Sequence, residues 1–531
     1  MTSTASAHTT TDSTLATAMQ DHGFATVAVV GTGAMGQGIA QMAAQAGAQV
    51  LLFDVGVGAA GKAHNALLAT WAKLQAKGKI SPEQEAQYAS RVTVANTVEA
   101  LAPSQLVVEA IVERLDIKQQ LFAQLEGIVD AQCVLTTNTS SLSVTAVAAV
   151  LSKPERFAGY HFFNPVPLMR VVEVIAGLKT SGQTCERLHS FSKAMGHTAV
   201  QAQDTPGFIV NHAGRGYGTE ALRIVSESVS DFATIDRILR DQMGFRLGPF
   251  ELMDLTALDV SHPVMESVYN QYYQEPRYRP SVITAQRLAG GVLGKKVGAG
   301  FYAYQDNQPN GTVITPPEPP VPAVAKLPPV WVSPKAARRQ ELYQLLKDLG
   351  ASIETGQAPS QHALIVVAPL GMDVTTLAAV EQHDASRVMG IDMMLPDANV
   401  KRRVLATNPA TRDDMRDAAH ALFAADGKPV SIIRDSGGFV TQRVVATIVN
   451  IAADMCQQGV CTPQDLDLAV TLGLGYPLGP LAMGDAIGPT NMLEILFNLQ
   501  TVYGDPRYRP SPWLRRRGAL GLSLRHVESG V

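Results

Sequence analysis

The sequence predicts an α/β domain followed by an all-helical domain, with a second, degenerate copy of both later in the chain. A short apolar run at Val27–Val30 leads into a glycine-rich turn, and strand-like and helical segments then alternate. The phrase DTPGFIVN (204–211) returns 231 positions later as DSGGFVTQ (435–442). A chain of 531 residues has room for this duplication, because one domain takes about 100–200 residues.

The bulk composition argues against several classes of protein. The net charge is −4, and no basic stripe or polybasic patch points to nucleic acid or to a membrane surface. No apolar stretch reaches the roughly 20 residues that span a bilayer. Residues 1–22 lack the core of a signal peptide, and we expect them to form a disordered tail.

Cysteine usage indicates a reducing compartment. The four cysteines are scattered, and none forms a CxxC pair. This pattern argues against a disulfide framework and against a zinc site. We therefore expect a cytoplasmic protein without a metal ion.

The first motif is a G-x-G-x-x-G turn between a strand and a helix. Gly31 permits a tight turn, Gly33 lets the backbone approach a pyrophosphate, and Gly36 lets the helix pack closely on the strand. The next strand ends at Asp54, where a carboxylate binds ribose hydroxyls and repels a 2′-phosphate. The motif predicts a Rossmann domain, which we place at 23–203, with NAD as its cofactor. The alternative is a tight turn that binds nothing.

Two later strand-like segments end in polar residues. The segments are 106–113 and 133–142, and they carry Glu113 and Ser140 near their ends. Ligands of such folds lie beyond the carboxyl ends of the strands, which makes Glu113 a candidate cofactor contact. A solvated loop acid explains Glu113 equally well.

Residues 160–175 contain a candidate acid–base pair. His161 follows a short strand-like run, the loop NPVP turns the chain, and Glu173 lies on a returning strand. This layout brings the carboxylate beside the imidazole. A histidine oriented by a carboxylate is a general base suited to neutral pH. The alternative is a His–Glu pair with a structural role only.

Taken together, these motifs resemble the L-3-hydroxyacyl-CoA dehydrogenase family. GTGAMGQGIA, VVEAIVE, TNTSSL, HFFNPVPLMRVVEV, DTPGFIVN and LGPFELMD follow the order and spacing of that family between Phe24 and about Tyr304. The resemblance implies reversible oxidation of an L-3-hydroxyacyl-CoA to the 3-oxoacyl-CoA with NAD. It also implies a helical domain, here 204–304, that dimerises.

The resemblance further implies roles for individual residues. His161 corresponds to the catalytic base and Glu173 to its orienting partner. Ser140 and Asn211 correspond to the hydroxyl and the amide that hold the reacting oxygen and the histidine network. A basic segment implies contacts with the phosphates of CoA, although a solvated helix face explains it equally well; its lysines are Lys73, Lys77 and Lys79.

The second copy keeps framework residues and loses the chemical ones. A proline-rich linker at 305–330 precedes a Rossmann-like segment at 331–434 and a second helical domain at 435–531. No G-x-G-x-x-G opens this copy. The three catalytic positions His161, Glu173 and Asn211 are replaced at the same offset by Asp392, Val404 and Gln442.

We interpret the second copy as a structural duplicate. It would cover the apolar surface that other family members bury by dimerisation, and homo-oligomers stay possible. A single chain with this extra module resembles the members of the family that act in bacterial phenylacetate catabolism, which implies 3-hydroxyadipyl-CoA as the substrate. The alternatives are 3-hydroxybutyryl-CoA in short-chain fatty acid metabolism, a free hydroxy acid or sugar acid, and an NAD-binding structural protein without activity.

Overall fold

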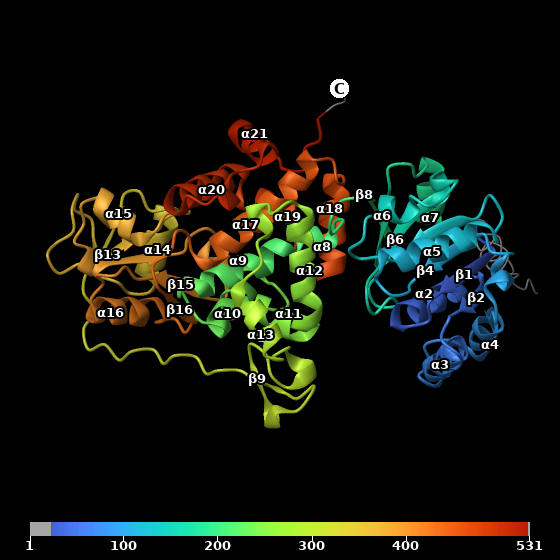
Figure 1. Cartoon of the computed structure of the whole chain (residues 1–531). Helices are drawn as coiled ribbons and strands as arrows, with labels where there is room; N and C mark the ends of the chain where they lie inside the picture. The colour runs from blue at the N-terminus through green and yellow to red at the C-terminus, as the bar shows by residue number, and fades with distance from the viewer. Residues whose placement is uncertain (1–22, 529–531) are drawn as a thin grey trace, which may run out of the picture. The chain divides into compact units, whose positions relative to one another are not determined.

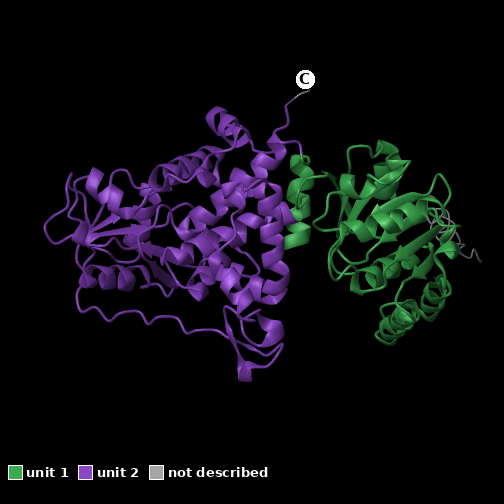
Figure 2. Cartoon of the chain, viewed as in Figure 1, with its two compact units in different colours: residues 1–210, 460–474 green, residues 211–459, 475–531 purple. Residues whose placement is uncertain are grey.

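The computed structural model describes residues 23–528, so the predicted tail and the last three residues lie outside the described part. The chain forms two compact units (Figure 2). Unit 1 consists of 1–210 and 460–474, and unit 2 consists of 211–459 and 475–531. Unit 1 therefore includes a segment from the second copy.

Unit 1 is built on an eight-stranded sheet with the order β3-β2-β1-β4-β5-β6-β7-β8 (Figure 1). Neighbouring strands are parallel except for β6 and β7, which are antiparallel. The central strands are almost completely buried and mainly apolar, as expected for a sheet covered on both faces. The strands are β1 (Thr26–Val30), β2 (Gln49–Phe53), β3 (Val92–Val94), β4 (Leu106–Glu109), β5 (Val134–Thr137), β6 (Phe157–Phe162), β7 (Val171–Ala176) and β8 (Thr198–Gln203).

Helices connect most of these strands, as parallel neighbours require. Trp71 is fully buried and belongs to the apolar cluster on one side of the sheet. The helices of unit 1 are α2 (Ala34–Gln45), α3 (Ala59–Ala76), α4 (Pro82–Ser90), α5 (Leu115–Glu126), α6 (Val144–Ala148), α7 (Gly182–Ala194) and α18 (Pro463–Leu474).

Unit 2 contains a second, shorter sheet with the order β12-β11-β13-β14-β15-β16. The strands β14 and β15 form an antiparallel pair, the counterpart of β6–β7. In this sheet β11 pairs directly with β13, whereas in unit 1 β4 lies between β1 and β5. The strands are β11 (Val330–Val332), β12 (Ile353–Glu354), β13 (Leu364–Val367), β14 (Val388–Ile391), β15 (Arg403–Ala406) and β16 (Val430–Ile433).

The rest of unit 2 is helical. The central helix α17 (Val440–Gln457) is buried along almost its whole length and packs against α9 (Arg215–Ser226). Within residues 23–528 no helix is long and apolar enough to cross a membrane. The other helices are α8 (Val210–Ala213), α10 (Phe232–Met243), α11 (Pro249–Thr256), α12 (Leu258–Gln271), α13 (Val282–Ala289), α14 (Arg339–Asp348), α15 (Val374–Val380), α16 (Asp413–Phe423), α19 (Pro480–Ile487), α20 (Pro489–Tyr503) and α21 (Pro512–Leu520).

The predicted linker, residues 305–330, begins inside a short β-ribbon. A two-stranded ribbon of β9 (Ala303–Tyr304) and β10 (Val313–Ile314) occupies its first part. The proline-rich remainder has almost no regular structure, as its composition predicts. Glu318 anchors it through a bidentate pair with Arg402, at 2.5 and 2.9 Å.

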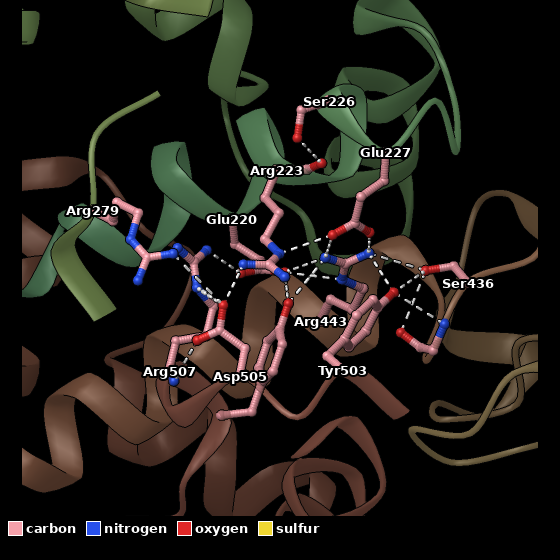
Figure 3. A network of polar contacts seen from close by, with 12 residues as sticks. Glu220, Arg223, Ser226, Glu227, Arg279, Ser436, Arg443, Tyr503, Asp505 and Arg507 are labelled. Carbon is pink, nitrogen blue, oxygen red and sulfur yellow. Dashed lines mark hydrogen bonds and ion pairs between the residues drawn. The ribbon is translucent and has the colours of Figure 1, made fainter. Parts of the chain in front are cut away.

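A buried polar network joins the two helical copies within unit 2 (Figure 3). Glu220 on α9 is fully buried and accepts hydrogen bonds from Arg443 on α17 and from Tyr508, at 2.9 and 2.7 Å. Arg443 also pairs with Glu227 at 2.6 Å, and Arg507 lies 3.4 Å from Glu220. Burial alone would raise the pKa of Glu220, but Arg443 and Arg507 hold it below its ordinary value.

Candidate active site

The glycine turn after β1 is shaped to receive a phosphate group. Gly31 has a φ of +94°, and a Cβ there would meet the carbonyl oxygen of Ala110 at 2.5 Å. A Cβ at Gly36 would meet the carbonyl oxygen of Gly31 at 1.9 Å, so helix and turn touch. A Cβ at Gly33, by contrast, meets nothing within 4 Å, and this residue caps α2 without a side-chain hydrogen bond. Open space therefore faces the N-terminus of α2, and these residues fit the pyrophosphate of a dinucleotide.

Asp54 follows β2 beside this turn. Its carboxylate accepts hydrogen bonds from the backbone and hydroxyl of Thr32, both at 2.8 Å, and from the backbone of Gly56 at 2.8 Å. Burial opposes its charge, but these hydrogen bonds hold the pKa of Asp54 below its ordinary value. The Asp54 carboxylate is therefore negatively charged at the position where the ribose hydroxyls of a nucleotide would bind.

Glu113 ties together the loops that follow β4 and β5. One of its oxygens accepts hydrogen bonds from the hydroxyl of Thr139 at 2.6 Å and from the backbones of Ser140 and Ser141 at 2.9 and 3.0 Å. Burial raises the pKa of Glu113, but the Thr139 hydrogen bond and the Lys118 ammonium outweigh it and lower that pKa overall. Glu113 is therefore a charged hydrogen-bond acceptor beyond the carboxyl ends of β4 and β5, where the sequence predicts the cofactor. The structure brings it close to Ser140.

Sequence reasoning missed Lys118, which connects this cluster to the core. Its ammonium is buried, 2.6 Å from the fully buried carboxylate of Glu109 and 3.4 Å from Glu113. The available signal was the helical pattern, because Lys118 lies on the same face of α5 as the buried Phe122 and Leu125. A lysine on an apolar face needs a buried partner.

His161 and Glu173 form a buried pair because they are register neighbours on β6 and β7. In an antiparallel pair such neighbours lie on the same face of the sheet, which overcomes their separation in sequence. The Nδ1–H of His161 donates to Oε2 of Glu173 at 2.5 Å. This contact leaves Nε2 as the ring nitrogen that can exchange a proton with a substrate. The rings of Phe163 and Phe208 lie against the imidazole, at 4.5 and 5.8 Å between centroids.

The repeated phrase at 204–211 makes two sets of hydrogen bonds within unit 1, and one of them reaches Glu173. The backbones of Ile209 and Val210 donate to Oε1 of Glu173 at 2.9 and 2.8 Å. Asp204 accepts from the backbones of Val144 and Thr145, at 2.9 and 2.7 Å, and so holds the start of α6. Glu173 is thus oriented by three hydrogen bonds and is fully buried.

For the other predicted site residues, all within residues 23–528, the structure gives no contact that supports a role. Asn211 follows Val210 directly and opens unit 2, so its position relative to His161 stays a prediction. The three lysines lie at and just after the end of α3, and all of them are exposed. Their exposure fits both the CoA contact and the solvated helix face.

The second copy repeats the hairpin of β6 and β7 without its chemistry. Asp392 and Val404 occupy the register positions of His161 and Glu173, and the Asp392 backbone donates to the Val404 carbonyl at 3.0 Å. Gln442 fills the site, donating to Asp392 at 2.9 Å and to the Pro369 carbonyl at 3.0 Å, and accepting from the Gly371 backbone at 2.7 Å. Within residues 23–528 no cluster of His, Cys, Asp and Glu could hold a metal ion.

Comparison with known proteins gives the family. The model described as "3-hydroxyacyl-CoA dehydrogenase, NAD binding domain" matches residues 26–205. The model described as "3-hydroxyacyl-CoA dehydrogenase, C-terminal domain" matches twice, at 207–304 and 438–531. The chain therefore belongs to the 3-hydroxyacyl-CoA dehydrogenase family. It is an oxidoreductase that uses NAD(H) and acts on an acyl-CoA substrate.

Individual relatives sharpen the comparison. The 3-hydroxyadipyl-CoA dehydrogenase of Escherichia coli (strain K12) is 38% identical over 93% of this chain and 98% of its own length. The crystal structure of a 3-hydroxybutyryl-CoA dehydrogenase from Escherichia coli K12 has a TM-score of 0.80 and 37% identity, and covers 94% of this chain and 99% of the other. The human mitochondrial hydroxyacyl-coenzyme A dehydrogenase is 37% identical over 52% of this chain and 91% of its own length. The last relative matches only about half of this chain.

Proposed function

We propose that the chain oxidises L-3-hydroxyadipyl-CoA to 3-oxoadipyl-CoA with NAD, with His161 as the base. The observation that carries the acid–base role is the buried contact between His161 and Glu173 on two neighbouring strands of the eight-stranded sheet. The substrate rests on the Escherichia coli 3-hydroxyadipyl-CoA dehydrogenase, which matches this chain across both copies.

The residues of the chain would act as follows. His161 takes the proton of the C3 hydroxyl on Nε2, while Glu173 holds the ring and balances the positive charge that develops on it. In the reverse direction the imidazolium returns the proton, and the Ser140 hydroxyl and the Asn211 amide donate hydrogen bonds to the reacting oxygen. Bound NAD supplies the hydride acceptor.

Asp54 favours NAD over NADP in this proposal. Its carboxylate keeps its charge and lies beside the glycine turn, where a 2′-phosphate would meet it. We also propose that Glu113 contacts the cofactor, that Lys73, Lys77 and Lys79 meet the phosphates of CoA, and that the protein works in the cytoplasm. The six-part division of the chain and the covering role of the second copy belong to the same proposal.

A second substrate has its own support. The crystal structure with a TM-score of 0.80 is that of a 3-hydroxybutyryl-CoA dehydrogenase, which favours a short acyl chain in fatty acid metabolism. Both substrates use the same acid–base pair, so the choice concerns the acyl pocket only.

The test is NADH formation by the purified protein with L-3-hydroxyadipyl-CoA and with L-3-hydroxybutyryl-CoA. We expect turnover with both, a higher kcat/KM for the adipyl substrate, and a loss of kcat on the order of 10²–10⁴-fold in His161→Ala. A higher kcat/KM for the butyryl substrate would overturn the substrate assignment. Full activity of His161→Ala would overturn the role of the pair.

A further inference from the structure

Helix α18 belongs to the second copy but packs in unit 1, against β7 and β8 (Figure 2). The carbonyl of Val460, just before this helix, accepts a hydrogen bond from the backbone of Gln203 on β8 at 2.8 Å. The degenerate copy thus supplies a helix to the sheet that carries Glu173.

On this helix Gly473 lies close to two valines of unit 1. A Cβ at Gly473 would meet the two methyl groups of Val210 at 3.0 and 3.2 Å and a methyl group of Val171 at 3.6 Å. Gly473 is inside a helix and does not have a positive φ, so its backbone does not require glycine. Glycine in a helix costs about 1 kcal/mol relative to alanine, and the close approach gives a steric reason for its presence.

One of the two valines that a Cβ at Gly473 would meet orients the carboxylate of Glu173. The backbone of Val210 donates to Oε1 of Glu173 at 2.8 Å. Val171 lies on β7, two positions before Glu173, and is fully buried. A side chain at Gly473 would therefore push on the donor that orients Glu173.

The other half of the repeat gives an internal comparison. Gln242 on α10 lies 231 positions before Gly473, and Thr441 and Arg402 lie 231 positions after Val210 and Val171. There the long side chain of Gln242 bridges the contact, accepting from the Thr441 hydroxyl and donating to the Arg402 carbonyl at 3.5 Å. The half with the acid–base pair has no side chain at that position.

We propose that Gly473, a residue of the degenerate copy, positions the acid–base pair of the first copy by letting Val210 lie where its N–H meets Glu173. This inference rests on the role of His161 and Glu173 under the proposed function. The second copy then contributes to catalysis as well as to covering apolar surface.

The test compares Gly473→Ala and Gly473→Val with a matched control. A displaced donor lowers kcat and leaves ground-state binding alone, so we expect kcat to fall about fivefold in the alanine variant and on the order of 10²-fold in the valine variant. The KM values for NAD and for the acyl-CoA should stay within about twofold. A Cβ at Gly61, on α3, would meet nothing within 4 Å, so Gly61→Ala should leave kcat unchanged.

A rescue separates positioning from general damage. Val210→Ala removes the methyl groups that a new side chain would meet and keeps the backbone N–H. We expect the double variant with Gly473→Val to recover at least about tenfold in kcat over Gly473→Val alone.

The inference and the proposed function fail in different ways. If His161→Ala is inactive while Gly473→Val keeps full kcat, the positioning role is overturned and the acid–base pair stands. If Gly473→Val lowers thermal stability and leaves the kcat of the folded enzyme unchanged, the contact is structural only, which also overturns the inference. If His161→Ala keeps full activity, the proposed function fails and the inference fails with it.

Discussion

The strand pairs β6–β7 and β14–β15 have the same backbone pairing in the two copies but carry different side chains. In the first, His161 faces Glu173, whose carboxylate accepts backbone hydrogen bonds from the segment at the start of α8. In the second, the register is the same, but Asp392 stands opposite Val404. Register depends on backbone pairing and on the apolar pattern, so it survives the loss of the side chains that carry the chemistry.

The helical parts of the two copies also differ, because a neutral residue in the first copy is replaced by a charged one in the second. In the first copy His212 lies between Tyr278 and Tyr272, 2.6 and 3.1 Å from their hydroxyls. Burial, with Arg215 and Arg277 nearby, lowers the pKa of His212 to about 3, so this centre is neutral. At the same offset the second copy has Arg443 between tyrosines, and this arginine is charged and paired.

This difference teaches that each copy has specialised. The first keeps the buried contact between His161 and Glu173, and the second supplies a buried cation that pairs with Glu220 of the first. Two identical copies would place either two neutral groups or two like charges at this interface. Because the copies differ, Arg443 of the second copy can neutralise the buried carboxylate of Glu220 in the first.

The largest expected effect comes from breaking the contact between His161 and Glu173 in the first copy. Glu173→Gln keeps the shape but removes the charge that orients and stabilises the imidazolium, so kcat should fall on the order of 10²–10⁴-fold. Steady-state NADH formation measures it. Asp392→Asn at the matching position of the second copy should leave kcat unchanged. A comparable loss in Asp392→Asn would show that the second site takes part in the reaction.

The next largest effect concerns the buried network. Glu220→Gln leaves Arg443 and Arg507 with less compensation in a fully buried place, and we expect unit 2 to lose about 3 kcal/mol of unfolding free energy. Denaturant unfolding measures it. Arg416→Ala breaks only exposed pairs with Asp413 and Asp417, so it should change stability by less than about 1 kcal/mol. Equal effects of the two variants would mean that burial of the network adds nothing.

A smaller effect depends on pH and belongs to the second site alone. Burial raises the pKa of Asp392 to about 6, although Gln442 and the Met394 backbone donate to it. The residues lining its small cavity are uncharged; they are Gln242, Met394, Leu395, Val400 and Thr441. Because this pKa is raised in the folded state, the stability it contributes is complete below about pH 4 and is lost as the pH rises through about 6.

Asp392→Asn should remove this dependence. The thermal midpoint of the variant should rise relative to the original protein between about pH 4 and pH 7, corresponding to a gain in unfolding free energy of about 2 kcal/mol. A difference that shrinks over this range would contradict the assignment of the buried proton to Asp392.

The smallest effect tests the basic segment. Each of Lys73→Ala, Lys77→Ala and Lys79→Ala removes one exposed charge, so KM for the acyl-CoA should rise by about two- to fivefold, and less at high salt. Lys347→Ala, on α14 of the second copy, is the control and should leave KM unchanged. No change in any of the three variants would favour the solvated helix face.

Much of the first site could be predicted from local patterns. The glycine turn and Asp54 follow from residues that are close in sequence, and the His161–Glu173 contact follows from two strands joined by one short loop. The buried position of Lys118 was not predicted, because helical periodicity indicates a buried face but does not show which carboxylate packs against it. Its partner Glu109 is on another element, and only the packed sheet brings the two charges together.

The sequence by itself determined the duplication, the nucleotide turn, the acid–base pair and the loss of that pair in the second copy, because each is written in residue types at a regular spacing. Only the tertiary structure decided where the second copy meets the first. The packing of α18 beside β7, the fit of Gly473 against Val210 and the pairing of Arg443 with Glu220 join residues hundreds of positions apart. Such contacts depend on how whole elements pack, and no local pattern encodes them.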